Sequence, residues 1–385
     1  MRIAYVYDVI HPYVPGGVQK RIWELSRRLA ARGHEVTLFG MKHWEGQDIV
    51  RREGVRLWGM CPPKDLFIND RRSISEALYV GWRALPVLPR ERFDVIDCQN
   101  FPYFPCFSAK VASMLRRSRL IITWHEVWAQ YWYQYLGRKG MLGAATERLA
   151  GKLAKVNLVG TRHNMEMLLS LGVKKDKITL LSIGGISLPD IERIRPSDKT
   201  SDVIFAGRLI KAKGVKDLLM ALAYLKTSQT RVNLSIIGDG PERAALEALS
   251  RELGIQDEVQ FHGNIEDDAE VISMMKSAKV FVYPASPEGG WSLSIIEANA
   301  CGLPAISFRS GKLGDNEVVV DGYNGLLAEQ EVPDDLGTKI RLVLEQPPLR
   351  TRLSQNALAF AQQQDWGHLT GVIEDCYSRA LLNVQ

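Results

Sequence analysis

The sequence predicts an α/β protein built from two doubly wound domains, each a parallel sheet with helices on both faces. Its 385 residues exceed the ~250–300 at which a single hydrophobic core stops growing. Apolar strand segments alternate with helical segments in both halves, as in a parallel sheet with crossover helices. A polar stretch with two prolines separates the halves at 186–200. We therefore expect a first domain at 1–188, a second at 189–363 and a terminal helical segment at 364–385.

The first half opens with a strand, a helix and a strand. An apolar strand at 3–10 is followed by the loop HPYVPGG and by a helix in which Ile22, Leu25 and Leu29 recur at helical spacing. Gly33 ends this helix, and HEVTLFG forms the next strand. This βαβ order implies parallel pairing. The later strands expected in this half are 93–98, 119–125 and 155–160, with a long helical stretch around 136–154.

The second half repeats this alternation. The expected strands are 202–208, 232–240, 279–286 and 303–308, and the helices are 215–226, a segment beginning at Pro241, and 294–302. Proline is well tolerated at the first position of a helix. The final segment, 366–382, is helical and has no strand left to follow it.

The composition excludes several classes of protein. With 46% hydrophobic and 24% charged residues, the chain is neither disordered nor collagen-like. No apolar run reaches the ~18–20 residues of a membrane span, and the opening MRIAYVYDVI is a strand pattern rather than a signal peptide. The 5 cysteines are scattered and form no CxxC pair, so they fit neither a disulfide framework nor a zinc site. We expect a cytoplasmic protein whose cysteines hold no zinc.

The charge is unevenly distributed between the halves. Residues 1–195 carry 31 Lys+Arg against 18 Asp+Glu, a net +13, and the remainder carries 18 against 26, a net −8. A basic half indicates an anionic partner, such as a membrane surface, a charged lipid or a nucleic acid, or else an ordinary solvated surface. No nucleic-acid recognition motif or arginine-rich stripe is present, so a nucleic-acid partner is not expected.

Ligands of doubly wound sheets bind beyond the carboxyl ends of the strands, so the loops there hold the candidate site residues. Gly16 and Gly17 follow the first strand and could bring backbone N–H groups close to a phosphate, or could form a tight turn. They are not the GxGxxG of a dinucleotide fold. Arg208 and Lys213, in GRLIKAKG, offer a planar fork and a point charge that suit a diphosphate. A solvated basic loop is the alternative.

The segment 287–298 holds the most specific candidates. Glu288 lies in a glycine-bearing loop and Glu297 on the helix that follows, and carboxylates accept hydrogen bonds from sugar hydroxyls. The N–H groups of Leu293 and Ser294, near the helix start, suit a phosphate. A buried glutamate in this otherwise apolar helix needs a partner, which a ligand would supply.

Two further strand ends hold unusual residues. The glycines of GDGPE (238–242) suit turn chemistry better than nucleotide binding. His125 ends an apolar strand, where a structural and a functional role have similar weight.

In this order and spacing, these segments resemble the retaining glycosyltransferases of family 4, which have the GT-B fold. The resemblance runs nearly end to end. The segments that carry it are PGG (15–17), His125, GRLIKAKG (207–214), GDGPE (238–242), HGNI (262–265), EGG…IIEANACGLP (288–304), NEVVVDGYNGLL (316–327) and the terminal helix with its tryptophan. It implies two Rossmann-like domains facing a central cleft, with the acceptor on the first domain and the donor on the second.

The resemblance implies a reaction and roles for the donor-binding residues. A sugar would move from a nucleotide diphosphate sugar to a hydroxyl acceptor with its anomeric configuration retained, without a divalent metal or another cofactor. Arg208 and Lys213 would neutralise the diphosphate leaving group, and Gly16 and Gly17 would contact it from the first domain.

Further roles follow from the same resemblance. Glu297 would bind the ribose, and the main chain around Asn264 and Ile265 would meet the base. Glu288 would grip the transferred sugar, and His125 would hold that sugar or stabilise charge near its anomeric carbon. The terminal helix would cross back onto the first domain, and domain closure would assemble the site.

The chain departs from the family pattern at three places. Eight residues separate Glu288 from Glu297 where the family has seven, so either one glycine of Gly289–Gly290 is inserted, which we favour, or the first carboxylate is absent. The interdomain segment 182–186 reads Ser-Ile-Gly-Gly-Ile in place of the usual Asn-Gly. Cys98–Gln99 stands where a histidine is common.

The acceptor is indicated by composition alone. Aromatic residues cluster at 124–135, close to basic residues at 116–119 and 138–139. Such a region suits a glycan or lipid-linked acceptor on an anionic membrane, with the protein peripheral at its inner face, and an aromatic core patch is the alternative. Two other functions remain open: a GT-B nucleotide-sugar epimerase, and a non-catalytic partner that binds nucleotide sugar without turnover.

Overall fold

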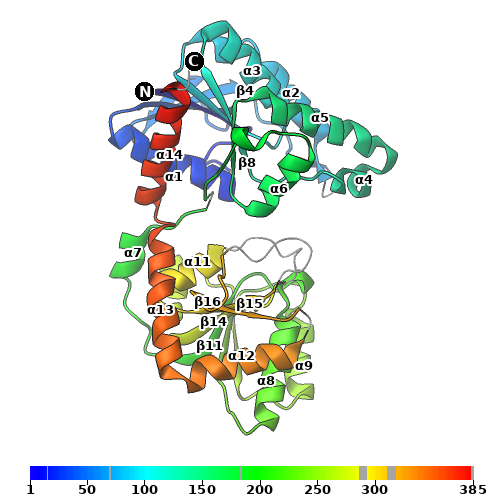
Figure 1. Cartoon of the computed structure of the whole chain (residues 1–385), viewed down its shortest axis with the longest axis vertical. Coiled ribbons are helices and arrows are strands. Elements are labelled where there is room, and N and C mark those ends of the chain that lie inside the picture. The colour runs from blue at the N-terminus through cyan, green and yellow to red at the C-terminus, as the bar shows by residue number, and fades with distance from the viewer. Residues whose placement is uncertain are drawn as a thin grey trace. The chain divides into compact units, whose positions relative to one another are not determined.

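The computed structural model describes residues 1–14, 16–68, 71–182, 184–285, 293–309, 318–330 and 332–382. The chain divides into two compact units, Met1–Gly184 with Trp366–Gln385, and Gly185–Asp365. The boundaries expected from the sequence were 188 and 363. Each unit contains a mainly parallel sheet covered by helices, so the predicted α/β class with two doubly wound domains is confirmed (Figure 1).

The first unit is built on one large sheet. Within the described residues its strand order is β10-β9-β8-β7-β1-β2-β4-β3, and only β3 pairs antiparallel. The strands are β1 (Arg2–Val6), β2 (Glu35–Met41), β3 (Ile49–Arg52), β4 (Val55–Cys61), β7 (Val95–Gln99), β8 (Arg119–Trp124), β9 (Val156–Val159) and β10 (Ile178–Leu180). The short pair β5 (Phe67–Ile68) and β6 (Arg71–Arg72) lies outside this sheet.

Helices cover both faces of this sheet because its strands are apolar on both sides. Ala4 and Ile122 belong to one core, and Ile3 and Ile121 to the other, as the two-residue period of a strand requires. The helices on the first core are α2 (Ile74–Ala84), α3 (Phe104–Arg116), α5 (Gly140–Leu153) and α6 (Arg162–Ser170), and those on the second are α1 (Gly17–Ala31) and α14 (Trp366–Leu382). The short α4 (Tyr131–Leu136) packs against α5.

Helix α14, the last in the chain, lies beside α1 (Figure 1). Its buried face includes Trp366, Ile373 and Tyr377. At the edge of this contact Glu374 accepts a hydrogen bond from Arg32 Nη1 at 2.9 Å and lies 2.7 Å from His34 Nε2. The end of the chain therefore completes the core of the first unit.

The second unit contains a parallel sheet ordered β13-β12-β11-β14-β15-β16 in the described residues. Its strands are β11 (Ser201–Ala206), β12 (Leu234–Ile237), β13 (Val259–Gly263), β14 (Ala278–Tyr283), β15 (Ala305–Phe308) and β16 (Gly325–Ala328). The helices are α7 (Leu188–Arg193), α8 (Val215–Thr227), α9 (Arg243–Glu252), α10 (Asp268–Lys276), α11 (Leu293–Ala300), α12 (Pro333–Glu345) and α13 (Pro347–Gln362). Helix α8 packs against α9 and α12, and α11 packs against α10 and α13.

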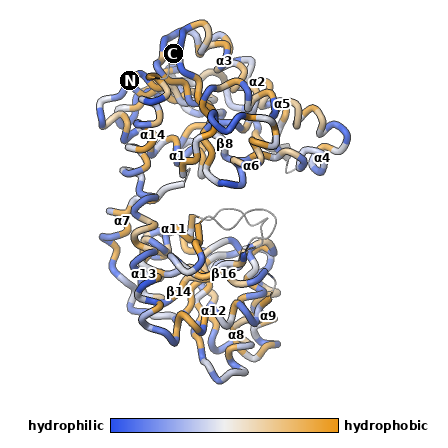
Figure 2. The backbone as a smooth tube through the Cα atoms, viewed as in Figure 1, coloured by the Kyte–Doolittle hydropathy of each residue, from blue (hydrophilic) through white to orange (hydrophobic). Residues whose placement is uncertain are grey.

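Several elements were not expected from the sequence. No element was predicted for the segments that form the strands β3, β4, β5, β6, β10, β13 and β16 and the helices α2, α4, α6, α7, α10, α12 and α13. Strand β4 is closely flanked by Gly54 and Pro62 and contains Gly59, which obscured its apolar run. Figure 2 shows hydrophobic and hydrophilic residues alternating along the helices, as expected of helices that cover a sheet with one face.

Candidate functional site

A pocket at the carboxyl ends of the strands of the second unit brings most of the predicted donor-binding residues together. Its volume is about 480 Å³, within the ~300–1,000 Å³ typical of ligand sites. It is lined by Ala206, Gly207, Arg208, Ile237, Gly238, Asp239, Asn264, Ile265, Val271, Ser294 and Glu297. The segments after β11, β12 and β13 and the helix α11 all contribute, so residues far apart in the sequence meet at one edge of the sheet.

Glycines allow these loops to approach one another closely. A Cβ atom at Gly238 would lie 2.0 Å from the Gly207 carbonyl oxygen, and one at Gly214 would lie 1.9 Å from the Pro284 carbonyl oxygen. Both glycines also have positive φ angles, of 126° and 67°. The close contact at Gly238 agrees with the turn role predicted for GDGPE. Gly238 and Asp239 also line the pocket.

Lys213 lies in the same loop as Arg208 but is not among the residues that line the pocket. Its ammonium group donates a hydrogen bond to the Tyr283 hydroxyl and lies 5.0 Å from the centre of the Tyr283 ring. Arg208 is exposed. The two cations predicted to act together therefore have different surroundings.

Helix α11 presents the other pocket residues. It begins at Leu293, and Ser294 and Glu297 lie one turn apart on the pocket side. The expectation of a buried Glu297 was wrong: it is half-buried, while its neighbours Ile296 and Ala298 are buried. Position 297 of this apolar helix faces the pocket rather than the core, which removes the need for a buried partner.

Glu288, Gly289 and Gly290 lie outside the described residues, as does Ile183 of the interdomain segment. The inserted glycine and the role of Glu288 therefore stay predictions.

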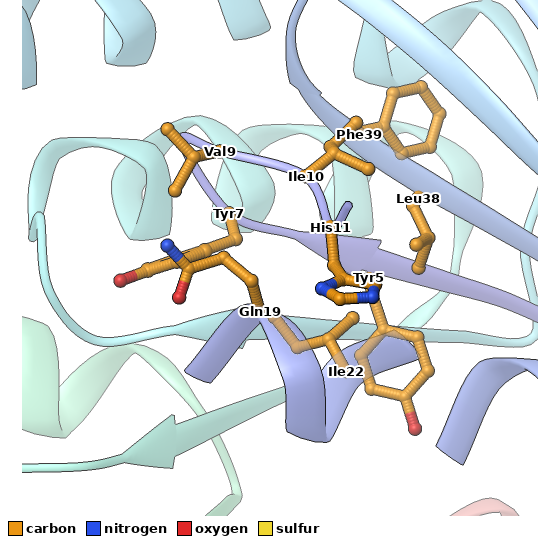
Figure 3. A pocket seen from close by; sticks show the side chains of 9 residues that line it. All are labelled: Tyr5, Tyr7, Val9, Ile10, His11, Gln19, Ile22, Leu38 and Phe39. Atoms are coloured by element: carbon orange, nitrogen blue, oxygen red, sulfur yellow. The ribbon is translucent and has the colours of Figure 1, made fainter. Parts of the chain in front are cut away.

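In the first unit, Gly16 and Gly17 lie at the N-terminus of α1. A Cβ atom at Gly16 would lie 2.3 Å from Oε1 of the Gln19 side chain, whereas one at Gly17 would meet no described atom within 4 Å. Internal packing therefore does not explain the glycine at 17. The buried Gln19 also lines a small cavity of about 10 Å³ between α1 and the loop after β1 (Figure 3).

His125 follows β8 and is held by a chain of buried side chains. Gln99 donates its amide N–H to Asp97 Oδ1 at 2.9 Å, so its Oε1 faces His125 Nε2 at 2.8 Å. Because Oε1 only accepts, the proton of the imidazole lies on Nε2. Burial and the Arg21 charge lower the pKa of His125 to about 3, so the ring is neutral near pH 7.

The same chain continues to the terminal helix. The Tyr377 hydroxyl donates to Asp97 Oδ2 at 2.5 Å and lies 2.9 Å from the Tyr5 hydroxyl, and Thr123 donates to Asp97 Oδ1 at 2.7 Å. Burial raises the pKa of Asp97, and these donors together with Arg21 oppose that effect. Helix α14 therefore contacts the residues that orient His125.

Arg21 is a residue of this region that sequence analysis missed. It is buried on α1, and its Nη1 has no hydrogen-bond partner among the described residues. It lies three residues after Val18 and four before Leu25, on the apolar side of the helix. That spacing was the available signal that its charge points inward.

A second buried charged cluster lies near the end of β1. Asp8 contacts Arg72, and Arg72 Nη2 lies 3.7 Å from Glu76 Oε2. Asp8 and Glu76 are buried. Burial raises the pKa of Glu76 to about 7, against the opposing charges of Arg72 and Lys64. None of these residues was singled out from the sequence.

The aromatic cluster at 124–135 is partly core and partly surface. Trp124 and Trp132 are buried, whereas Tyr131 and Tyr133 are exposed. Trp132 also lines a hollow of about 60 Å³, and its Nε1 has no hydrogen-bond partner among the described residues. The other residues around the hollow are Arg72, Ser73, Ile74, Ala77, Phe101, Pro102, Tyr103, Phe104 and Tyr135.

The described residues show neither a metal-binding cluster nor a membrane-spanning helix. They contain no group of three or more His, Cys, Asp or Glu side chains arranged to hold a metal ion. Of the helices among them, none combines the length and the hydrophobicity needed to cross a bilayer.

Family comparisons agree with this architecture in both halves. Residues 15–184 match the family described as Glycosyltransferase Family 4, and residues 189–360 match the family described as Glycosyl transferases group 1. Two doubly wound units with a pocket at the strand ends of the second are the GT-B architecture. The chain belongs to the family 4 and group 1 glycosyltransferases.

Individual relatives resemble parts of the chain. An N,N'-diacetylbacillosaminyl-diphospho-undecaprenol α-1,3-N-acetylgalactosaminyltransferase of Campylobacter jejuni is 28% identical over 250 residues, 62% of this chain and 64% of its own. An uncharacterised glycosyltransferase of Methanocaldococcus jannaschii is 33% identical over 163 residues, 42% of this chain and 44% of its own. The chain thus spans less than two thirds of the length of these curated relatives.

A solved structure resembles the whole chain. The Anabaena protein HepE, crystallised with UDP and glucose, has a TM-score of 0.69 at 17% identity and covers 98% of this chain and 99% of its own. At this identity the likeness shows the fold.

Proposed function

We propose that the protein is a retaining glycosyltransferase that moves a sugar from a nucleotide diphosphate sugar to a hydroxyl group of a lipid-linked or membrane-borne glycan. The observation that carries the proposal is the pocket of about 480 Å³, where Arg208, Asn264, Ile265, Ser294 and Glu297 line one space. Each had been assigned to donor binding from the sequence. The family membership of both halves supports the same activity.

In this proposal the donor lies along the strand ends of the second unit. The Arg208 guanidinium binds the diphosphate, and Ser294 with the N-terminus of α11 adds hydrogen-bond donors. Glu297 accepts hydrogen bonds from the ribose, and the base lies against Asn264 and Ile265. Lys213, Leu293 and, in the first unit, Gly16 and Gly17 keep their predicted donor-binding roles.

The chemical step breaks the bond between the anomeric carbon and the diphosphate oxygen and forms one to the acceptor hydroxyl oxygen. The diphosphate leaves with an additional negative charge, which Arg208 stabilises. The acceptor hydroxyl releases its proton to solvent as the new bond forms, which balances the additional negative charge of the diphosphate. His125, neutral and with its Nε2 proton held by Gln99, positions the transferred sugar rather than contributing a full positive charge.

The acceptor class rests on two observations of different kinds. The Campylobacter relative is named for a diphospho-undecaprenol acceptor, and the first half of this chain is net basic. A soluble glycan acceptor is the alternative, and the assay must distinguish it from a lipid-linked or membrane-borne acceptor.

The test is a thermal-shift screen with UDP-, GDP- and ADP-sugars, followed by turnover with a membrane extract. A ligand at 100 times its dissociation constant should add about 2.7 kcal/mol of stability. Glu297→Gln should reduce the shift given by the preferred nucleotide. A new glycolipid with the donor's anomeric configuration, formed also after EDTA treatment, supports the proposal.

Other outcomes identify the alternatives. An isomerised nucleotide sugar without transfer would indicate the epimerase, and binding without any turnover would indicate the non-catalytic partner. If no nucleotide sugar shifts the protein at millimolar concentration, the donor site is wrongly assigned.

A further inference from the structure

The outer surface of α2, α3, α4 and α5 carries an unusual number of exposed hydrophobic side chains. Trp82 is 74% exposed, Leu142 67% and Leu115 66%. The exposed large hydrophobic residues on these four helices are Ile74, Leu78, Trp82, Val111, Met114, Leu115, Tyr131, Tyr133, Met141, Leu142 and Leu149. We call this set the apolar face.

The spacing of these residues gives each helix an outward stripe. Ile74, Leu78 and Trp82 recur every four residues along α2, and Leu142 and Leu149 lie seven residues apart on α5. The opposite sides of the same helices carry the core residues, such as Val80. Helix α2 packs against α3, α3 against α5 and α5 against α4, so the stripes belong to one continuous helical layer (Figure 1).

The exposed charges on these four helices all have one sign. The four helices contain two acidic residues, Glu76 and Glu147, and both are buried. Glu147 accepts hydrogen bonds from Tyr103 Oη and from the N–H groups of Trp128 and Ala129, each at 2.7 Å. Exposed basic side chains on these helices and on the turn between α4 and α5 are Arg83, Arg116, Arg138, Lys139, Arg148 and Lys152.

We propose that the apolar face docks the first unit on an anionic membrane surface. Tryptophan, tyrosine and aliphatic side chains would enter the interfacial region, and the basic side chains would contact acidic headgroups. A second copy of the chain fits less well, because a symmetric interface would place the same positive charges opposite one another. The inference rests on the proposed function, since a membrane-borne acceptor gives this face its role.

The test uses the full chain with vesicles of phosphatidylcholine, with and without phosphatidylglycerol, in a flotation assay. We expect binding to the anionic vesicles, with little binding to pure phosphatidylcholine and a decrease at high salt. Trp82→Gln with Leu115→Gln should weaken binding on the order of tenfold or more. Arg148→Gln with Lys152→Gln should weaken it by about fivefold per charge.

Matched controls lie on the second unit. Met220→Gln with Leu358→Gln removes two exposed apolar side chains there, and Arg251→Gln with Arg352→Gln removes two exposed charges. Neither pair should change vesicle binding. Because all eight positions are exposed in the structure, the thermal midpoint of each double variant should stay near that of the wild type.

Three results would overturn the inference: no binding to anionic vesicles, equal binding to neutral vesicles, or equal binding by the wild type and the apolar-face variants. A concentration-dependent dimer lost in the Trp82→Gln, Leu115→Gln variant would assign the face to a second copy instead. The nucleotide-sugar thermal shift is measured on the same samples. Vesicle binding without that shift would support membrane docking by the apolar face and contradict the proposed function.

Discussion

At the scale of single residues, Arg208 is the group whose charge matters most for the proposed donor. Arg208→Ala should weaken binding of the preferred nucleotide sugar by about 10- to 100-fold, because hydrogen bonds between charged groups contribute roughly 1.5–3 kcal/mol. Lys211→Ala is the matched control, since Lys211 is an exposed cation of the same loop that does not line the pocket. Titration calorimetry measures both. Equal losses in the two variants would mean that the loop acts only through its overall charge.

Glu76 should make stability depend on pH near neutrality. Its pKa is about 7 in the folded protein and near its usual value of 4.5 in the unfolded chain, so the folded state binds the extra proton. The stability that the protonated Glu76 carboxyl group contributes to the folded state is therefore fully present below about pH 4.5 and is lost as the pH rises through 7. Glu76→Gln, which keeps a neutral side chain, should gain stability relative to the wild type across that window.

The measurement is the difference in unfolding free energy between Glu76→Gln and the wild type, from urea titrations at pH 5, 6, 7 and 8. A difference that is constant over this range would show that the carboxyl group titrates elsewhere. Comparing the two proteins at each pH removes the contributions of other groups, including the low-pKa His125.

At the scale of elements, the loop that joins β11 to α8 depends on Gly214. Gly214→Ala combines a positive φ with a Cβ atom 1.9 Å from the Pro284 carbonyl oxygen. Gly254→Ala has nearly the same φ, +66°, but its Cβ meets no described atom within 4 Å. We expect about 1–2 kcal/mol of destabilisation at Gly254, the cost of the left-handed conformation, and a clearly larger loss at Gly214.

The two substitutions should also differ in their effect on nucleotide-sugar binding. The backbone shift forced at position 214 should move the Arg208 loop and weaken nucleotide-sugar binding, whereas Gly254→Ala should leave binding unchanged. Chemical denaturation and the thermal-shift assay provide the two measurements. Equal effects of the two substitutions on stability would show that the contact with Pro284 relaxes without cost.

At the scale of the whole molecule, each unit has its own hydrophobic core, and the terminal helix belongs to the first. Ile373→Ala on α14 and Ile306→Ala on β15 truncate buried side chains in different units, and each should cost about 2–5 kcal/mol. Scanning calorimetry should show a different part of the unfolding transition moving to lower temperature in each variant. The preferred nucleotide sugar should stabilise the part that Ile306→Ala lowers.

A donor that stabilised only the part lowered by Ile373→Ala would place the site in the first unit. A single transition that both substitutions lower equally would show that the units unfold together.

The sequence by itself determined the α/β class, the helix at 366–382 and five of the eleven residues that line the donor pocket. Apolar periodicity identifies strands and helices, and the rule that ligands bind at the carboxyl ends of parallel strands selects the loops with Arg208 and Glu297. Asn264 and Ile265 were indicated by the resemblance to the family 4 glycosyltransferases.

Only the tertiary structure decided which face each charged or aromatic side chain occupies. The buried Glu76 and the exposed Trp82 differ from neighbouring residues in burial rather than in local pattern. The chain from Tyr377 through Asp97 and Gln99 to His125 joins residues on α14, β7 and the end of β8. Such contacts depend on how the sheet orders its strands and where the last helix packs, and a one-dimensional pattern does not contain that information.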